Sequence, residues 1–203
     1  MQAKICGLTT VDQVKTCVSN GANFCGFILN YKKSHRFIDY QTAEKLTRIN
    51  KKNTSYVGVL VSPSEKELKT FSNLNFDYFQ IYGEYSSKEI ELIKKNYKKK
   101  IIMSLQIKQK LDILKYKIYE KVADIILFDS SGLHRSLSWD YDWVKQVPPS
   151  VKKMIAGNIN TDMLENLKEI TDIVDVSGAL ETDKVKDLNK IKNFLNKIKQ
   201  IND

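Results

Sequence analysis

Eight short apolar runs alternate with segments of helical spacing along the whole chain, and this alternation restricts the fold more than any other feature of the sequence. Most of the runs are continuous in apolar residues, as in parallel strands that are covered on both faces. They lie at residues 4–7, 24–29, 56–61, 78–83, 100–106, 123–129, 152–157 and 172–177. Strands separated by helices predict an α/β fold with a parallel sheet.

Local signals mark the intervening helices. Three pairs have the spacing of a capping box, which joins a Ser or Thr N-cap to a Glu or Gln three residues later. They are Thr10 with Gln13, Ser64 with Glu67, and Ser86 with Glu89. Gly21 lies where a C-cap would end the first helix. Apolar residues then recur at helical spacing, so these segments are predicted to pack one face on the sheet.

The number of strand–helix units helps to decide whether the sheet is closed or open. Dividing 203 residues among eight strand–helix units leaves about 25 residues for each, near the lower size limit of a (β/α)₈ barrel. A doubly wound open sheet usually has a glycine-rich turn after its first strand, whereas KICGLTT contains one glycine. We therefore predict one (β/α)₈ TIM barrel domain over residues 1–203, with its chemistry at the C-terminal ends of the strands.

The net charge of +9 and the pI near 9.3 raise the question of a nucleic-acid partner. Three of the 33 basic residues are arginine, the side chain best suited to bidentate contacts with phosphates and guanines. The densest basic run, KKNYKKK at residues 94–100, closes a helical pattern, where cations complement the helix dipole. The charge therefore favours a small anionic ligand over nucleic acid.

No stretch approaches the roughly 18 apolar residues of a membrane span, and the start MQAKICG lacks the features of a signal peptide. Cys6, Cys17 and Cys25 are odd in number and form no CxxC pair. His35 and His134 have no metal-binding spacing and are expected in surface loops. We expect a cytoplasmic protein with reduced thiols, no metal and no membrane partner. The oligomeric state is left open.

Two strand ends carry groups suited to proton transfer. Cys6 ends the first run beside a glycine, where nearby cations would favour a thiolate that acts as a base. A small buried side chain is the commoner role of a free cysteine, and Cys17 and Cys25 fit that role. Asp129 closes an apolar run that would raise its pKa toward neutrality, as an acid requires. A helix N-cap or an ion pair is the alternative role for Asp129.

Anion-binding groups are expected at the last two strand ends. The backbone amides at Gly157 and Asn158, and at Ser177 and Gly178, have the position of the phosphate cradle that barrels often build there. Ordinary tight turns would also account for the two glycines.

Seven stretches of the chain resemble the phosphoribosylanthranilate isomerase family, the small single-domain barrels of tryptophan biosynthesis. They are KICGLTT, GFILNYKKSHR, VGVLVSPS, QIYGE, ILFDSS, MIAGNI, and VDVSGALE followed by KVKDLNKIKNFL. The resemblance implies a cofactor-free Amadori rearrangement of N-(5-phosphoribosyl)anthranilate, an anionic phosphosugar, to 1-(2-carboxyphenylamino)-1-deoxyribulose 5-phosphate.

The same resemblance implies roles for individual residues. Asp129 matches the general acid that protonates the furanose ring oxygen, and Cys6 matches the base that takes the C2 proton. Arg36 matches the arginine that holds the anthranilate carboxylate, and Asp175 an aspartate near the sugar hydroxyls. The chain departs from the family pattern in the loop after Asp129 and at His35, Tyr82, Asn158 and Ala179.

Two other functions remain as alternatives. The phosphosugar barrel that closes the indole ring in the same pathway uses a lysine acid and a glutamate base, whereas these strand ends offer Cys and Asp. A non-catalytic barrel that binds anions or nucleic acid would fit the charge of +9. Salt-dependent binding of duplex DNA without isomerase activity would favour that second alternative.

Overall fold

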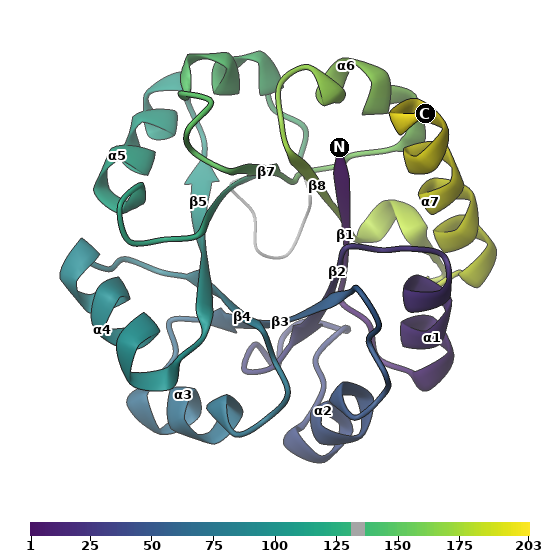
Figure 1. The fold of residues 1–203 in the computed structure, drawn as a ribbon, viewed down its shortest axis with the longest axis horizontal. Coiled ribbons are helices and arrows are strands. Elements are labelled where there is room, and N and C mark those ends of the chain that lie inside the picture. The colour runs from purple at the N-terminus through teal and green to yellow at the C-terminus, as the bar shows by residue number, and fades with distance from the viewer. Residues whose placement is uncertain (131–136) are drawn as a thin grey trace.

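The computed structural model describes residues 1–130 and 137–203, and its described residues contain eight parallel strands that close into a barrel (Figure 1). Each strand pairs with the next along the chain, and β8 pairs with β1 through the register Lys4↔Asp175. The predicted fold class is therefore confirmed. The strands are β1 (Gln2–Cys6), β2 (Phe24–Ile28), β3 (Ser55–Val61), β4 (Tyr78–Tyr82), β5 (Lys100–Ile107), β6 (Ile125–Ser130), β7 (Lys153–Ile155) and β8 (Ile173–Val176).

Each predicted strand overlaps an observed one, but at five of the eight strands the predicted C-terminal edge runs too far. The first prediction included Gly7 and the seventh included Gly157, whose φ angles are +77° and +106°. Left-handed backbone of this kind does not continue a strand, so β1 ends at Cys6 and β7 at Ile155. The chain therefore turns immediately after these strands, where the site lies.

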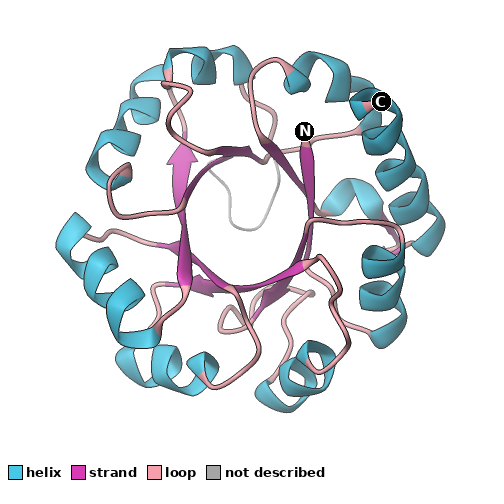
Figure 2. Cartoon of the chain, viewed as in Figure 1, coloured by secondary structure: helices cyan, strands magenta, loops and turns pink. Residues whose placement is uncertain are grey.

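The three predicted capping boxes are all present. They begin α1 (Val11–Ser19), α3 (Glu65–Ser72) and α4 (Ser87–Tyr97). α1 ends with Asn20 as its C-cap, so the predicted cap, Gly21, lies one residue beyond the observed one, at φ +86°. Aspartate N-caps begin α2 (Tyr40–Thr47) and α7 (Leu188–Asn202). The helices lie outside the ring of strands (Figure 2).

The helices that the structure describes after β5, β6 and β7 are short or of the 3₁₀ type. β5 is followed by a 3₁₀ helix, η1 (Lys110–Lys115), and one turn of helix, α5 (Tyr116–Tyr119). The described residues after β6 form a 3₁₀ helix, η2 (Tyr141–Gln146), which stops before Pro148 and Pro149. After β7 come η3 (Thr161–Met163) and α6 (Leu164–Lys168). η4 (Gly178–Leu180) and the hairpin β9 (Glu181–Thr182) and β10 (Val185–Lys186) separate β8 from α7.

Two apolar layers hold the barrel together. One fills the space between strands and helices, and the other lies inside the barrel. The inner layer includes Phe24, Val57, Tyr78, Ile102, Leu127, Met154 and Ile173. Burial of one such side chain contributes roughly 1.5–3 kcal/mol. This packing closes the barrel below its C-terminal mouth, so the strand ends form the floor of a pocket.

The basic run at residues 94–100 ends α4, as predicted, and it has a structural function. Nζ of Lys94 lies 2.9 Å from Oδ1 of Asp124. Lys99 donates hydrogen bonds to the backbone carbonyls of Leu74 and Phe76, at 3.1 and 2.9 Å.

In the part of the chain that the structure describes, no helix is long and apolar enough to cross a membrane.

Candidate active site

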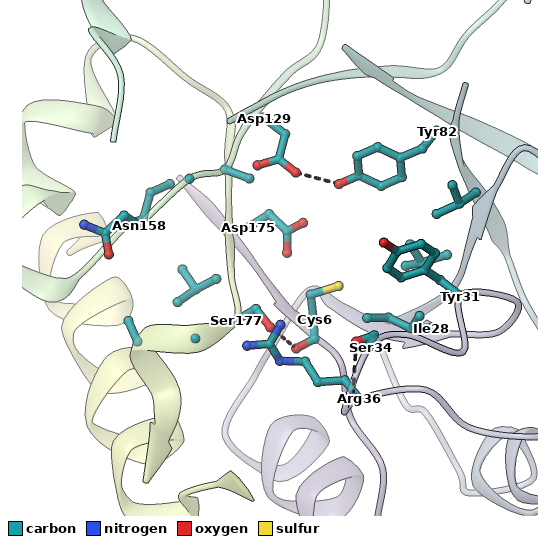
Figure 3. A pocket seen from close by; sticks show the side chains of 18 residues that line it. Cys6, Ile28, Tyr31, Ser34, Arg36, Tyr82, Asp129, Asn158, Asp175 and Ser177 are labelled. Atoms are coloured by element: carbon teal, nitrogen blue, oxygen red, sulfur yellow. Dashed lines mark hydrogen bonds between the residues drawn. The ribbon is translucent and has the colours of Figure 1, made fainter. Parts of the chain in front are cut away.

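One pocket at the C-terminal mouth of the barrel contains all eight residues that the sequence singles out (Figure 3). They are Cys6, Arg36, Asp129, Gly157, Asn158, Asp175, Ser177 and Gly178. Parallel strands bring their C-terminal ends to the same edge, which explains why positions so far apart in the chain meet here.

Asp129 lies near the end of β6 and is held by two uncharged donors. The hydroxyl of Tyr82, at the end of β4, donates to Oδ2 at 2.7 Å, and the backbone N–H of Ser130 donates to Oδ1 at 2.7 Å. Nε2 of Gln80 in turn donates to the Tyr82 oxygen at 3.1 Å. Burial raises the pKa of Asp129 to about 6, although these hydrogen bonds act in the opposite direction. The carboxyl group can therefore carry a proton close to neutral pH.

Cys6 ends β1 on another side of the pocket, next to a buried ion pair. Lys4 is fully enclosed, and its Nζ lies 2.7 Å from Oδ2 of Asp175 on β8. Burial raises the pKa of the Cys6 thiol, and Asp175 adds to this effect, whereas the Lys4 ammonium lowers it. Burial also works against the Lys4 ammonium, but the nearby Asp175 and Cys6 outweigh it and raise the pKa of Lys4. The Lys4 side chain beside the Cys6 sulfur is therefore protonated at neutral pH.

Arg36 reaches the pocket from the loop after β2, and its stem lies across Gly7. A methyl group at Gly7 would lie 2.4 Å from Cδ of Arg36, so the glycine of KICG makes room for the arginine. Nε and Nη2 of the guanidinium form a bidentate pair with Glu181, at 2.9 Å for Nη2. Burial opposes the ionisation of Glu181, yet its hydrogen bonds with Arg36 and Lys186 lower its pKa to about 2.

The turn after β7 has an unusual backbone. Gly157 and Asn158 follow one another with φ angles of +106° and +49°. Trp139 Nε1 donates to the carbonyl of Ala156 at 2.9 Å, and the Tyr141 hydroxyl donates to the carbonyl of Gly157. Both aromatic residues come from the chain before and within η2, so this segment holds the turn from outside. The carbonyl groups of Ala156 and Gly157 are thereby occupied.

The family model described as "N-(5'phosphoribosyl)anthranilate (PRA) isomerase" matches residues 3–197. The chain belongs to this isomerase family. The resemblance drawn from the sequence is thus confirmed.

Two curated phosphoribosylanthranilate isomerases illustrate how far the similarity extends. The enzyme of Streptococcus mutans is 32% identical over 205 residues, covering 98% of this chain and 99% of its own. That of Streptococcus gordonii is 33% identical over 203 residues, covering 98% and 97%. The similarity therefore spans nearly the full length of both relatives.

Solved structures of family members have the same fold. The Thermotoga maritima isomerase superimposes with a TM-score of 0.88 at 24% identity, covering 98% of this chain and 99% of that one. A phosphoribosylanthranilate isomerase in complex with reduced 1-(o-carboxyphenylamino)-1-deoxyribulose 5-phosphate has a TM-score of 0.85 at 23% identity, covering 98% and 99%. At these identities the comparison establishes the barrel.

Three charged residues of the site were missed by the sequence reasoning. Glu181, from the segment after β8, pairs with Arg36, and Lys186 of the same segment pairs with Glu181. Lys4 lies below Cys6. Lys4 had a detectable signal, because a lysine inside an otherwise buried strand needs a partner. Glu181 and Lys186 had none, since charged residues in a loop are ordinary.

The remaining predictions from the sequence concern residues other than the eight that meet in the pocket. Cys17 and Cys25 are fully buried, as predicted. His35 lies in a loop with its side chain 40% exposed, 3.2 Å from Oε2 of Glu181. His134 and Arg135 fall outside the described residues. Among the residues on either side of that gap, no group of three or more His, Cys, Asp or Glu could hold a metal ion.

Proposed function

We propose that this protein converts N-(5-phosphoribosyl)anthranilate to 1-(2-carboxyphenylamino)-1-deoxyribulose 5-phosphate in tryptophan biosynthesis, with Asp129 as general acid and Cys6 as general base. The observation that carries the proposal is that a family match along the chain coincides with a thiol and a carboxyl group in one buried pocket. The proposed reaction requires no cofactor, because both steps are proton transfers.

Asp129 opens the ring. Its protonated carboxyl group donates to the furanose ring oxygen, the bond from that oxygen to C1 breaks, and the substrate nitrogen supplies the electrons for a protonated Schiff base. A pKa near 6 supports this role, because an ordinary aspartate would hold almost no proton at neutral pH.

Cys6 completes the isomerisation. Its thiolate removes the proton from C2, the electrons move toward the imine nitrogen, and the resulting enolamine tautomerises to the ketone. A Schiff base is open to hydrolysis, so burial of both groups supports the proposal by restricting water at the reacting atoms.

Two sets of groups would bind the anionic ends of the substrate. The guanidinium of Arg36 would hold the anthranilate carboxylate, and Glu181 would keep the guanidinium in position through its bidentate pair. The phosphate would bind to backbone amides at Gly157 and Asn158 on one side and at Ser177 and Gly178 on the other.

Asp175 would act beside the sugar. Its Oδ2 accepts from Lys4, while its Oδ1 is buried in the described structure with no hydrogen-bond partner. Such an oxygen fits a ribose hydroxyl, which would supply the missing hydrogen bond.

We also propose a cytoplasmic location, because the base requires a reduced Cys6 and the three cysteines are free.

The proposal is tested with the purified protein and freshly made N-(5-phosphoribosyl)anthranilate, by following the loss of its fluorescence. We expect rapid consumption and formation of the ketose product, identified by mass. A protein that leaves the substrate unchanged, while a known isomerase consumes it in parallel, would contradict the proposed function.

A further inference from the structure

Lys4 is the most unusual charged residue of the barrel that the proposed mechanism does not use. It lies in the middle of β1 between Ala3 and Ile5, and all three side chains are shielded from solvent. An unpaired ammonium in such a place would cost several kcal/mol, so the position needs a strong reason to keep its charge. Buried charges beside a cleft are often functional.

The surroundings of Lys4 connect it with Asp175 and Cys6, two residues of the pocket floor. Its Nζ forms the 2.7 Å pair with Asp175, its register partner on β8. On β2, Gly26 is the register partner of Cys6. A methyl group at Gly26 would lie 3.0 Å from Sγ of Cys6 and 3.1 Å from Nζ of Lys4, so the sulfur and the ammonium are neighbours across this glycine.

We propose that Lys4 is a positioning residue for Cys6: its buried ammonium, anchored by Asp175, stabilises the thiolate that removes the substrate proton. This inference rests on the role proposed for Cys6. In a buried setting with a low effective dielectric, one nearby cation acts strongly on a thiolate. Asp175 then has two functions, as a partner of Lys4 through Oδ2 and as a free acceptor through Oδ1.

Other charged and titratable groups also act on the sulfur, and they come from several elements. Asp175 opposes the thiolate, Lys186 of β10 favours it more weakly than Lys4 does, and Arg36 and Tyr82 are also within its electrostatic reach. Lys4 is therefore the strongest single support of the thiolate, and Lys186 is a natural reference for the effect of a second buried lysine.

The experiment measures the rate at which iodoacetamide alkylates Cys6 in the free, full-length protein as a function of pH. The thiolate displaces iodide, so the midpoint of the rate profile reports the thiol pKa. Peptide mass mapping distinguishes Cys6 from Cys17 and Cys25, which are fully buried and serve as internal references for unfolding. The readout does not depend on isomerase activity, so its failure is separate from failure of the proposed function.

We expect Lys4→Met to move the midpoint to higher pH and to lower the alkylation rate at pH 7 at least tenfold. Lys186→Met should produce a smaller shift in the same direction. In the isomerase assay, Lys4→Met should lower kcat while KM stays within a few-fold. An unchanged midpoint in Lys4→Met, or an equal shift in Lys186→Met, would overturn the proposal.

A second variant separates this role from a purely structural ion pair and covers the case in which Lys4→Met does not fold. Lys4→Met combined with Asp175→Asn removes both charges and leaves neither partner buried alone. If Lys4 supports the thiolate, the midpoint stays above that of the wild type. A return to the wild-type midpoint would mean that Lys4 only neutralises Asp175, and the proposal would be wrong.

Discussion

Asp129 and Cys6 line the same pocket and are both buried, but their neighbours differ in charge. The donors to Asp129 are a phenol and a backbone amide, which are neutral. Cys6 lies beside the ammonium of Lys4. Burial raises the pKa of both groups. The largest opposing effect comes from the Tyr82 hydrogen bond at Asp129 and from the Lys4 ammonium at Cys6. Neutral donors leave the carboxyl able to hold a proton, whereas a cation helps the thiol to lose one.

This contrast has a kinetic consequence. The pKa of Cys6 is raised above its usual range, while that of Asp129 is about 6, so the form with a thiolate and a protonated carboxyl group is a minor one. The fraction of the protein in this form is constant at pH values between the two pKa values and decreases at lower and at higher pH. The acid limb of kcat/KM should therefore follow Asp129 and the alkaline limb should follow Cys6.

The largest expected effect comes from removing either reacting group. Cys6→Ala and Asp129→Asn should each lower kcat by about 10²–10⁴-fold, the usual contribution of a general acid or base. Steady-state kinetics and circular dichroism would separate lost chemistry from lost structure.

Cys25→Ala is the matched control, because Cys25 is a buried thiol on the neighbouring strand. It should keep kcat/KM within about twofold and lose roughly 1 kcal/mol of stability. Near-normal turnover in Cys6→Ala would exclude the thiol from the mechanism.

An intermediate effect should appear in the pH dependence of folding. The pKa of Asp129 is higher in the folded protein than the roughly 3.9 of an unfolded chain, so folding favours its protonated form. The stabilisation is present at low pH and is lost as pH rises from about 4 through about 6. Urea unfolding at pH 4.5 and 7.5 should show the wild type losing about 2 kcal/mol more than Asp129→Asn. An equal loss in both proteins would mean that the carboxyl group has an ordinary pKa.

The smallest effect is expected at Tyr82, where a histidine is common in the family. Removing the hydroxyl in Tyr82→Phe takes away a donor that favours the charged carboxylate, so the pKa of Asp129 should rise. A net hydrogen-bond contribution of about 0.5–1.5 kcal/mol corresponds to roughly half a unit to one unit. The acid limb of kcat/KM should move to higher pH by that amount.

Tyr78→Phe provides the reference for this measurement, because Tyr78 is a buried tyrosine at the other end of the same strand. The acid limb of the kcat/KM profile of Tyr78→Phe should stay at the same pH as in the wild type. A shift of the Tyr82→Phe limb toward lower pH would show that the phenol acts on Asp129 in some other way.

Much of the fold was predictable because its signals are local. The capping pairs that begin α1, α3 and α4 lie three residues apart and were all found. The short 3₁₀ helix η2 after β6 was not predicted, since the sequence continues in mixed polar and apolar residues up to Pro148. A helix with no tertiary support needs many residues to be stable, so a short segment has little local preference to detect.

The individual groups of the pocket could be named in advance because the order of strands in a parallel barrel requires their C-terminal ends to meet. Which groups touch could not be named. The contacts of Lys4 with Asp175, of Arg36 with Glu181 and of Tyr82 with Asp129 join residues far apart in the chain. Those contacts depend on the register between strands, on the path of each loop and on the burial that keeps water out of the pocket. Burial and neighbouring charge, which govern how readily Cys6 and Asp129 exchange protons, arise only when the barrel closes.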